Sequence, residues 1–153
     1  MDKAYSPAEV EKKWLEYWDR EKLYSPTELK EGRPNYSVLL PPPNANASLH
    51  AGHAMFVVQD ILIRYHRMKG CNTVWIPGTD HAGFETQYVF EKQLAKQGTS
   101  RFAYNRSDLY EAIAKFVDDN SGLIEEQLKS LGFSLDWSRK TFTLDDRVVK
   151  TVY

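Results

Sequence analysis

Residues 41–53 read Pro-Pro-Pro-Asn-Ala-Asn-Ala-Ser-Leu-His-Ala-Gly-His and lie between two apolar segments. Residues 36–40 precede them and have the length and apolar character of a buried strand. Residues 54–69 follow them and repeat apolar side chains at helical spacing. The chain is therefore predicted to form a strand, a proline-stiffened turn and the start of a helix.

Two histidines mark the predicted start of this helix. His50 and His53 are three residues apart, which places both rings on one helical face. A helix N-terminus favours phosphate, and Gly52 leaves room for a flat ring against the backbone. The pattern predicts a nucleotide site with two imidazoles directed at the phosphates. A His-x-x-His pair can also be incidental, or half of a metal site, but Cys71 is the only cysteine, so no metal site is predicted.

A second predicted strand and the stretch after it complete the predicted site. Residues 72–77 read as a strand parallel to the first, because strand–helix–strand units of this spacing are parallel and right-handed. Ligands of such units bind beyond the carboxyl ends of the strands. Those ends are residues 41–53 and 78–87, the latter reading Gly-Thr-Asp-His-Ala-Gly-Phe-Glu-Thr-Gln. We expect the two stretches to meet in one crevice.

The other predicted elements surround this unit. Ser6 and Pro7 are typical of a helix start, and the aromatic stripe that follows is expected to pack on the body, with docking of a partner as the alternative. Ser107 is expected to cap a helix that continues to Leu131. In the helix after the motif, Asp60 and Arg64 form an expected surface pair. The face expected to be buried there consists of Ala54, Val58, Ile61, Tyr65 and Met68.

Composition limits the function classes. The chain has 153 residues, 42% hydrophobic and 27% charged, with a net charge of −1, so no overall basic field indicates nucleic acid. The sequence has no apolar signal region and no run long enough to span a bilayer. The single cysteine fits a reducing compartment, and we expect a cytoplasmic protein with no membrane partner. The absence of a Gly-x-Gly-x-x-Gly pattern or a phosphate-loop lysine argues against dinucleotide-binding and P-loop folds.

The His-Ala-Gly-His motif at a strand–helix junction resembles the signature of class I aminoacyl-tRNA synthetases. The proline-rich turn before it and residues 78–87 after it are most similar to the valyl-tRNA synthetase family, and residues 133–139 resemble that family's Gly-x-x-x-Asp-Trp segment. The resemblance runs from about Tyr5 to Tyr153. One departure is Ala-Asn-Ala at residues 45–47, where valyl enzymes commonly have Val-Thr-Gly and isoleucyl enzymes Ala-Asn-Gly.

The resemblance implies an α/β fold, namely the N-terminal half of a Rossmann-like (HUP-type) parallel-sheet catalytic domain with a leading N-terminal helix. Residues 1–35 would form that helix and a loop, and residues 36–153 the first half of the nucleotide-binding domain. The editing insertion, the Lys-Met-Ser-Lys-Ser loop and the anticodon-binding part of the family are expected to be missing.

The resemblance also implies the chemistry. The family joins valine to its tRNA through a valyl-adenylate, with ATP and Mg²⁺ as substrate, so the implied partners are valine, ATP, tRNA(Val) and the remainder of the synthetase chain. His50 and His53 would be catalytic, donating hydrogen bonds to the phosphates. Further implied ATP contacts are Pro43, Asn46 and Gly52, implied valine contacts are Pro42, Asn44 and Asp80, and His81 and Gln87 would lie in the crevice.

Three other interpretations stay open at this point. They are an isoleucyl-type synthetase fragment, a nucleotidyltransferase with a His-x-Gly-His motif, and a non-catalytic, synthetase-like binding module. Asp80 could also act only as a turn residue that caps the following helix. On its own, the chain is expected to bind ATP weakly and to be marginally stable or self-associating.

Overall fold

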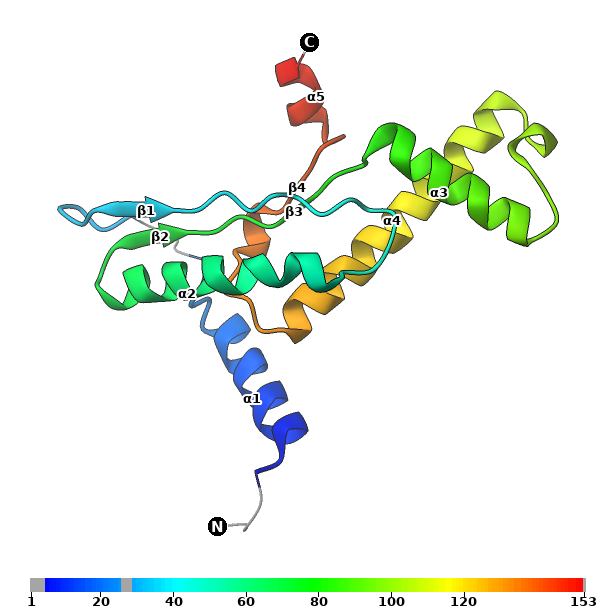
Figure 1. Cartoon of the computed structure of the whole chain (residues 1–153). Coiled ribbons are helices and arrows are strands. Elements are labelled where there is room, and N and C mark those ends of the chain that lie inside the picture. Colours follow the sequence, from blue (N-terminus) through cyan, green and yellow to red (C-terminus); the bar gives the residue numbers. More distant parts are fainter. Residues whose placement is uncertain (1–4, 26–28, 153) are drawn as a thin grey trace.

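The computed structural model describes residues 5–25 and 29–152 of an α/β protein (Figure 1). Pro26, expected in the loop after the first helix, and Tyr153, expected in the last helix, lie outside these residues. None of the helices in the described ranges combines the length and apolar character needed to cross a bilayer. The elements in chain order are α1 (Pro7–Arg20), β1 (Asn35–Ser37), the 3₁₀ turn η1 (Ala51–Ala54), α2 (Met55–Met68), β2 (Asn72–Val74), β3 (Gly78–Thr79), α3 (Gly83–Lys96), η2 (Arg101–Ala103), α4 (Arg106–Ser130), η3 (Trp137–Arg139), β4 (Thr141–Phe142) and α5 (Asp146–Val152).

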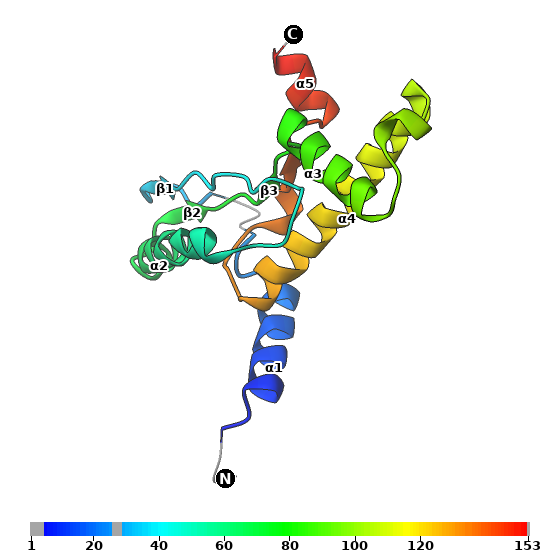
Figure 2. The same cartoon turned by 45° about the vertical axis from the view of Figure 1, so that its right-hand side comes forward.

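The sheet layer consists of two short parallel pairs. β1 pairs with β2, with Tyr36 opposite Thr73, and β3 pairs with β4, with Thr79 opposite Phe142. The helix α2 lies along one face of the β1–β2 pair, and in both views no described helix lies on the other face (Figures 1 and 2). The predicted parallel strand–helix–strand unit and the Rossmann-like fold class are confirmed, with strands shorter than expected.

The first strand was expected to be buried throughout, and this prediction is wrong. Along residues 35–40 the side chains alternate between exposed and covered: Tyr36 and Val38 are half-buried and Leu40 is buried, whereas Leu39 is 84% exposed. Alternation of this kind means that one face of the strand packs on the core and the other faces solvent.

The core lies between α2, α4 and the sheet. The buried apolar residues that contact one another come from all three and from the turn after α4, which explains why the turn carries aromatic residues. They are Leu40, Phe56, Ile63, Trp75, Ile124, Leu128, Phe133 and Leu135.

Helix α2 buries a different face from the one predicted. Phe56 and Ile63 point into the core, while Val58, Ile61 and Tyr65 of the expected face are between 54% and 60% exposed. Met68 is 88% exposed, and Ala54 belongs to the preceding 3₁₀ turn, where it is also exposed. The helix carries apolar side chains on two sides, so its periodicity alone cannot select the side that packs on the sheet.

The pair Asp60–Arg64, expected on the surface, is part-buried and joins three segments. Arg64 Nε lies 2.7 Å from Asp60 Oδ2, and the Arg64 guanidinium also donates to the carbonyl of Gly132. Asp60 Oδ1 accepts from the backbone N–H and the hydroxyl of Ser134, at 2.9 and 2.6 Å. The guanidinium of Arg64 also lies 5.3 Å from the Trp18 ring, so this network holds the end of α1 against the turn after α4.

The leading helix begins as predicted, with Ser6 at the N-cap and Pro7 in the first turn. Its aromatic stripe only partly packs on the body: Trp18 is half-buried, whereas Trp14 is 46% and Tyr17 39% exposed. Most of α1 therefore extends away from the other elements (Figure 1).

The cap of α4 differs from the prediction. Asn105, not Ser107, is the N-cap residue, and its side-chain oxygen accepts the N–H of Asp108 at 2.9 Å. An asparagine two residues upstream therefore satisfies a free N–H of the first turn, and Ser107 becomes an ordinary helical residue. At the other end Leu131, expected as the last helical residue, is the C-cap and is 63% exposed.

Asp136 ties the turn after α4 to β2 and to the segment after α1. Its carboxylate is fully buried and accepts hydrogen bonds from Ser25 Oγ at 2.7 Å, from Ser138 Oγ at 2.6 Å and from Arg139. Its N–H donates to the carbonyl of Trp75 at 2.8 Å. Burial raises the pKa of Asp136, but the hydrogen bonds from Ser138, Ser25 and Arg139 outweigh burial and hold the pKa below its ordinary value.

We predict that Asp136→Asn lowers the free energy of unfolding by about 3 kcal/mol at pH 7, because a buried ionic network loses its charge. A carboxyl whose pKa is lower in the folded state stabilises the fold above its unfolded pKa of about 3.9, and this stabilisation disappears as the pH falls through the folded pKa. The difference between wild type and variant should therefore narrow below about pH 4 in denaturant titrations.

The exposed Asp118 provides the matched control, and Asp118→Asn should change the free energy of unfolding by less than about 0.5 kcal/mol. If Asp136→Asn and the wild type had the same free energy of unfolding at pH 7, the role assigned to the carboxylate would be contradicted.

Candidate functional site

The two motif-bearing stretches, expected to meet in one crevice, are joined by backbone pairing. The N–H of Asp80 donates to the carbonyl of Pro43, and the N–H of Ala45 donates to the carbonyl of Asp80, both at 2.8 Å. Asn44 and Asp80 therefore form a parallel bridge. The proline-rich turn and residues 78–87 share one edge of the sheet.

The prolines explain why regular pairing stops before this bridge. Ser37 pairs with Val74 and Asn44 pairs with Asp80. Between these two pairs the first segment is therefore one residue longer than the second. Residues 41–43 are prolines, which have no N–H to donate to a neighbouring strand. The turn thus bulges out of the sheet and returns to it at Asn44.

The two histidines of the motif lie together in a single 3₁₀ turn. His50 is the N-cap of η1, and its Nδ1 accepts the N–H of Gly52 at 3.0 Å. His53 Nδ1 accepts the N–H of His50, also at 3.0 Å. The ring centroids are 4.2 Å apart. The expectation that both rings share one face is confirmed, although the turn is 3₁₀ rather than α-helical.

These contacts determine which ring nitrogens are free. A ring nitrogen that accepts a backbone N–H carries no proton, so the neutral forms of His50 and His53 carry their proton on Nε2. His53 Nδ1 also lies 3.3 Å from the His50 carbonyl oxygen, to which it could donate only if it carried the proton. This contact is longer than the one with the His50 N–H. Both Nε2–H groups are hydrogen-bond donors, and no hydrogen bond within the described ranges uses them.

Gly52 makes room for the first of these rings. A Cβ at this position would lie 2.7 Å from His50 Cε1 and 3.0 Å from His50 Nδ1, closer than side chains pack. The close neighbour of Gly52 in the structure is therefore the His50 imidazole.

A hollow of about 330 Å³ opens beside the turn, with Phe56 and Ile124 of the core among its walls. This volume falls in the range of small-molecule sites. Every site residue predicted from the first stretch lines the hollow: Pro42, Pro43, Asn44, Asn46, His50, Gly52 and His53.

The residues predicted from the second stretch lie next to this hollow but do not line it. Asp80 Oδ1 accepts the N–H of Ala82 at 3.1 Å, which is a turn-stabilising contact, and it also accepts the hydroxyl of Thr143 at 3.0 Å. His81 Nδ1 is 3.3 Å from Asp80 Oδ1. Gln87 points along its own helix and donates to Glu91 at 2.8 Å.

Two further polar residues contact the predicted site. Asn44 Nδ2 donates to Glu85 Oε2 at 2.8 Å, which links the turn to the start of α3. Thr143 contacts both Asp80 and His81 from the segment after β4. The sequence gives no signal for Thr143, because a two-residue strand followed by a threonine has no distinctive pattern.

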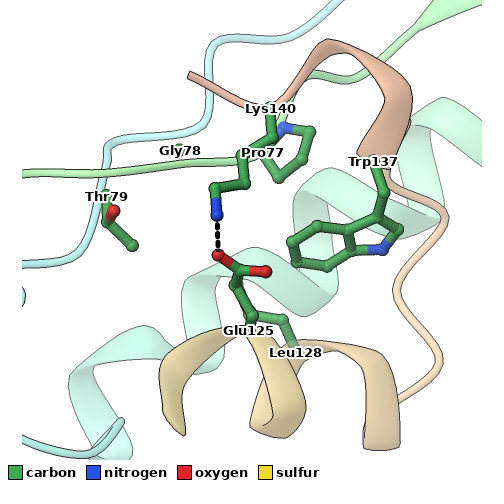
Figure 3. A pocket seen from close by; sticks show the side chains of 7 residues that line it. All are labelled: Pro77, Gly78, Thr79, Glu125, Leu128, Trp137 and Lys140. Atoms are coloured by element: carbon green, nitrogen blue, oxygen red, sulfur yellow. Dashed lines mark hydrogen bonds and ion pairs between the residues drawn. The ribbon is translucent and has the colours of Figure 1, made fainter. Parts of the chain in front are cut away.

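A second small depression lies between β3, α4 and the segment 137–140 (Figure 3). Lys140 reaches across it and forms an ion pair with Glu125, while Trp137 lies beside them. The space between these side chains is too narrow for a water molecule. We therefore assign it to packing of β3 on α4.

The arrangement as a whole suits a ligand with opposite charges at its two ends. The two histidines with Nε2–H donors line the hollow, and the bridge joins Asn44 of its lining to Asp80, which carries a carboxylate. Donors near a helix start favour an anion, and a carboxylate favours a cation.

Comparisons with known proteins agree with this geometry. Residues 13–153 match the family of class I tRNA synthetases (I, L, M and V). The chain is 45% identical to a valine–tRNA ligase of Desulfotalea psychrophila, 46% to one of Geobacter sulfurreducens and 44% to one of Thermus thermophilus, in each case over 99% of this chain and 17–18% of the relative. The chain thus spans about one sixth of the length of these relatives.

Solved structures show the same fold. A LeuRS–tRNA–LeuAMS complex from Agrobacterium radiobacter K84 superposes with a TM-score of 0.74 at 22% identity, over 95% of this chain and 17% of that one. A Mycobacterium tuberculosis methionyl-tRNA synthetase with methionyl-adenylate gives 0.56 at 23% identity, over 74% of this chain and 19% of that one. With the family match covering most of its length, this chain belongs to the class I tRNA synthetases.

Proposed function

We propose that this chain is the ATP- and valine-binding N-terminal part of a valine–tRNA ligase. The observation that carries the proposal is the Asn44–Asp80 bridge, which joins the stretch that carries His50 and His53 to the stretch that carries Asp80. The identity of 44–46% to valine–tRNA ligases supports valine as the amino acid.

In the proposed reaction the carboxylate of valine attacks the α-phosphorus of ATP·Mg²⁺, which gives valyl-adenylate and releases pyrophosphate. The aminoacyl group then passes to the terminal ribose of tRNA(Val). Neither step needs a protein nucleophile, so the protein contributes positioning and stabilisation of charge.

Each predicted residue has a role in this proposal. His50 and His53 donate from Nε2 to the phosphates, and Pro43, Asn46 and Gly52 border the nucleotide in the hollow. Pro42 and Asn44 border the valine side chain, and Asp80 binds its ammonium group. His81 and Gln87 belong to the amino-acid side of the site. The remainder of the synthetase would supply the tRNA contacts.

The proposal predicts valine-dependent exchange between ATP and pyrophosphate. We would fuse this chain to the part of the Geobacter sulfurreducens ligase that follows its matching segment, and assay the fusion beside the chain alone and the complete Geobacter enzyme. We expect exchange with valine by the fusion and little or none by the chain alone.

The other outcomes identify the competing functions. Exchange with isoleucine in place of valine indicates an isoleucyl-type enzyme. A folded fusion that binds ATP without any exchange indicates a non-catalytic binding module. Adenylyl transfer to a phosphorylated acceptor by the chain alone indicates a nucleotidyltransferase.

A single methyl group tests the role of the imidazoles. We predict that Gly52→Ala in the fusion lowers the exchange rate about 10²-fold, because the added Cβ displaces the His50 ring and removes one donor from the transition state. Gly52 is exposed, so the midpoint of unfolding should stay close to that of the parent fusion.

Gly122 of α4 is the matched control, since a Cβ there meets no atom within 4 Å. Gly122→Ala should retain the full exchange rate. If Gly52→Ala exchanged as fast as Gly122→Ala, the Nδ1-anchored position of His50 would have no role in the reaction.

A further inference from the structure

The three histidines near the paired loops are held in two opposite ways. His50 and His53 accept backbone N–H groups at Nδ1, whereas His81 Nδ1 faces two oxygens, one of Thr143 and one of Asp80. We propose that Thr143 is a positioning residue that fixes Asp80 and His81 as a pair of hydrogen-bond acceptors for the ammonium group of the amino-acid substrate. The identity of the ligand rests on the proposed function, whereas the positioning does not.

The hydroxyl of Thr143 has one proton and two lone pairs to distribute. The backbone N–H of His81 donates to Thr143 Oγ1 at 2.9 Å and occupies one lone pair. Asp80 Oδ1 lies 3.0 Å away, and an ionised carboxylate can only accept, so the hydroxyl proton points to Asp80.

One lone pair then remains for the His81 ring, whose Nδ1 lies 2.7 Å from the hydroxyl oxygen. His81 Nδ1 must therefore donate a proton to this lone pair, and Asp80 Oδ1, 3.3 Å from Nδ1, also favours a proton on that nitrogen. The neutral His81 ring therefore carries its proton on Nδ1 and a lone pair on Nε2, which is the reverse of His50 and His53.

The acceptors that remain are open to a ligand. Asp80 Oδ1 is used by Ala82 and Thr143, while no hydrogen bond in the described part of the chain uses Asp80 Oδ2. The side chains of His81 and Asp80 are 38% and 34% exposed. A Cβ at Gly83 would lie 3.9 Å from His81 Nε2, so the glycine leaves this nitrogen less covered.

The fold delivers Thr143 to this position through β4. The N–H of Thr143 donates to the carbonyl of Thr79 at 3.3 Å, which continues the β3–β4 pairing by one residue. Asp145 Oδ2 accepts the N–H of Phe142 at 2.8 Å and fixes the turn that follows. A residue more than sixty positions downstream is thus locked beside Asp80 by backbone contacts.

Together these contacts give the site a defined polarity. The stretch that contains Asn44 carries the Nε2–H donors of His50 and His53, and the stretch bridged to it carries the acceptors Asp80 Oδ2 and His81 Nε2. A substrate pair with phosphates at one end and an ammonium group at the other matches this order.

The tautomers can be measured on the 153-residue chain itself, without any activity. Long-range proton–nitrogen correlation spectra at pH 8 distinguish the Nδ1–H and Nε2–H forms of a neutral imidazole. We expect His50 and His53 as Nε2–H forms and His81 as the Nδ1–H form. In Thr143→Val, which keeps the shape but lacks the hydroxyl, His81 should lose the Nδ1–H preference, and Thr143→Ser should keep it.

Thr151, an exposed threonine of α5, provides the matched control: Thr151→Val should leave the His81 spectrum unchanged. An Nε2–H form of His81 in the wild type, or an unchanged Nδ1–H form in a folded Thr143→Val, would overturn the proposal. If Thr143→Val does not fold, the wild-type spectrum and Thr143→Ser still decide the question.

The fusion described above tests the ligand. Thr143→Val should raise the KM for valine about tenfold and leave the KM for ATP unchanged, since one charge-assisted contact is lost on the amino-acid side only. Thr143→Ser should restore the KM for valine. Equal changes in both KM values would indicate a general structural role and contradict the inference.

The two proposals fail in different ways. If the spectra show the predicted tautomers but the fusion shows no exchange, the positioning role stands and the ligase function is rejected. Valine-dependent exchange with an Nε2–H His81 would support the ligase and reject the positioning role.

Discussion

Two backbone hydrogen bonds, from Asp80 to Pro43 and from Ala45 to Asp80, are the contact on which the site depends. They connect a turn that cannot pair in the ordinary way, because its three prolines donate nothing, to the end of the neighbouring strand. Without them, the histidine turn and the Asp-His pair would belong to two independent loops. With them, two stretches more than thirty residues apart in the sequence are held at hydrogen-bond distance, and the side chains they carry have fixed relative positions.

The two halves of the site fix their hydrogen-bond donors and acceptors in different ways. Both rings of the His-Ala-Gly-His turn are tied down by backbone N–H groups of that turn, so the motif determines its own tautomers. The His81 ring has no such backbone donor among the described residues, and its proton is placed by Thr143 in the segment after β4. One half of the site is therefore encoded in four consecutive residues and the other half in the tertiary fold. This difference accounts for the fact that Asp80 and His81 are recognisable in the sequence, whereas Thr143 is not.

Other predictions from the sequence divide along the same line. The strand–helix–strand unit, the contact between the two stretches and the neighbouring histidine rings follow from local pattern and from the rules of parallel sheets, and the structure confirms them, although the second stretch does not line the hollow. The buried face of α2, the burial of the Asp60–Arg64 pair and the cap at Asn105 were predicted wrongly. Each of these depends on a choice between two locally equivalent options, such as two apolar helix faces or two capping residues. Packing makes that choice, and the sequence pattern does not contain it.

The face of α2 that packs on the core also connects the site to the rest of the fold. Phe56, one turn after the motif, lines the hollow and contacts Phe133 across the core with ring centroids 6.4 Å apart. Phe133 adjoins Ser134, which Asp60 binds, and Asp136, which binds Trp75. The wall that Phe56 contributes to the hollow is therefore held by the same turn that anchors α2 and β2. A turn rich in aromatic and buried polar residues thus anchors α2, the helix that directly follows the turn with both imidazoles.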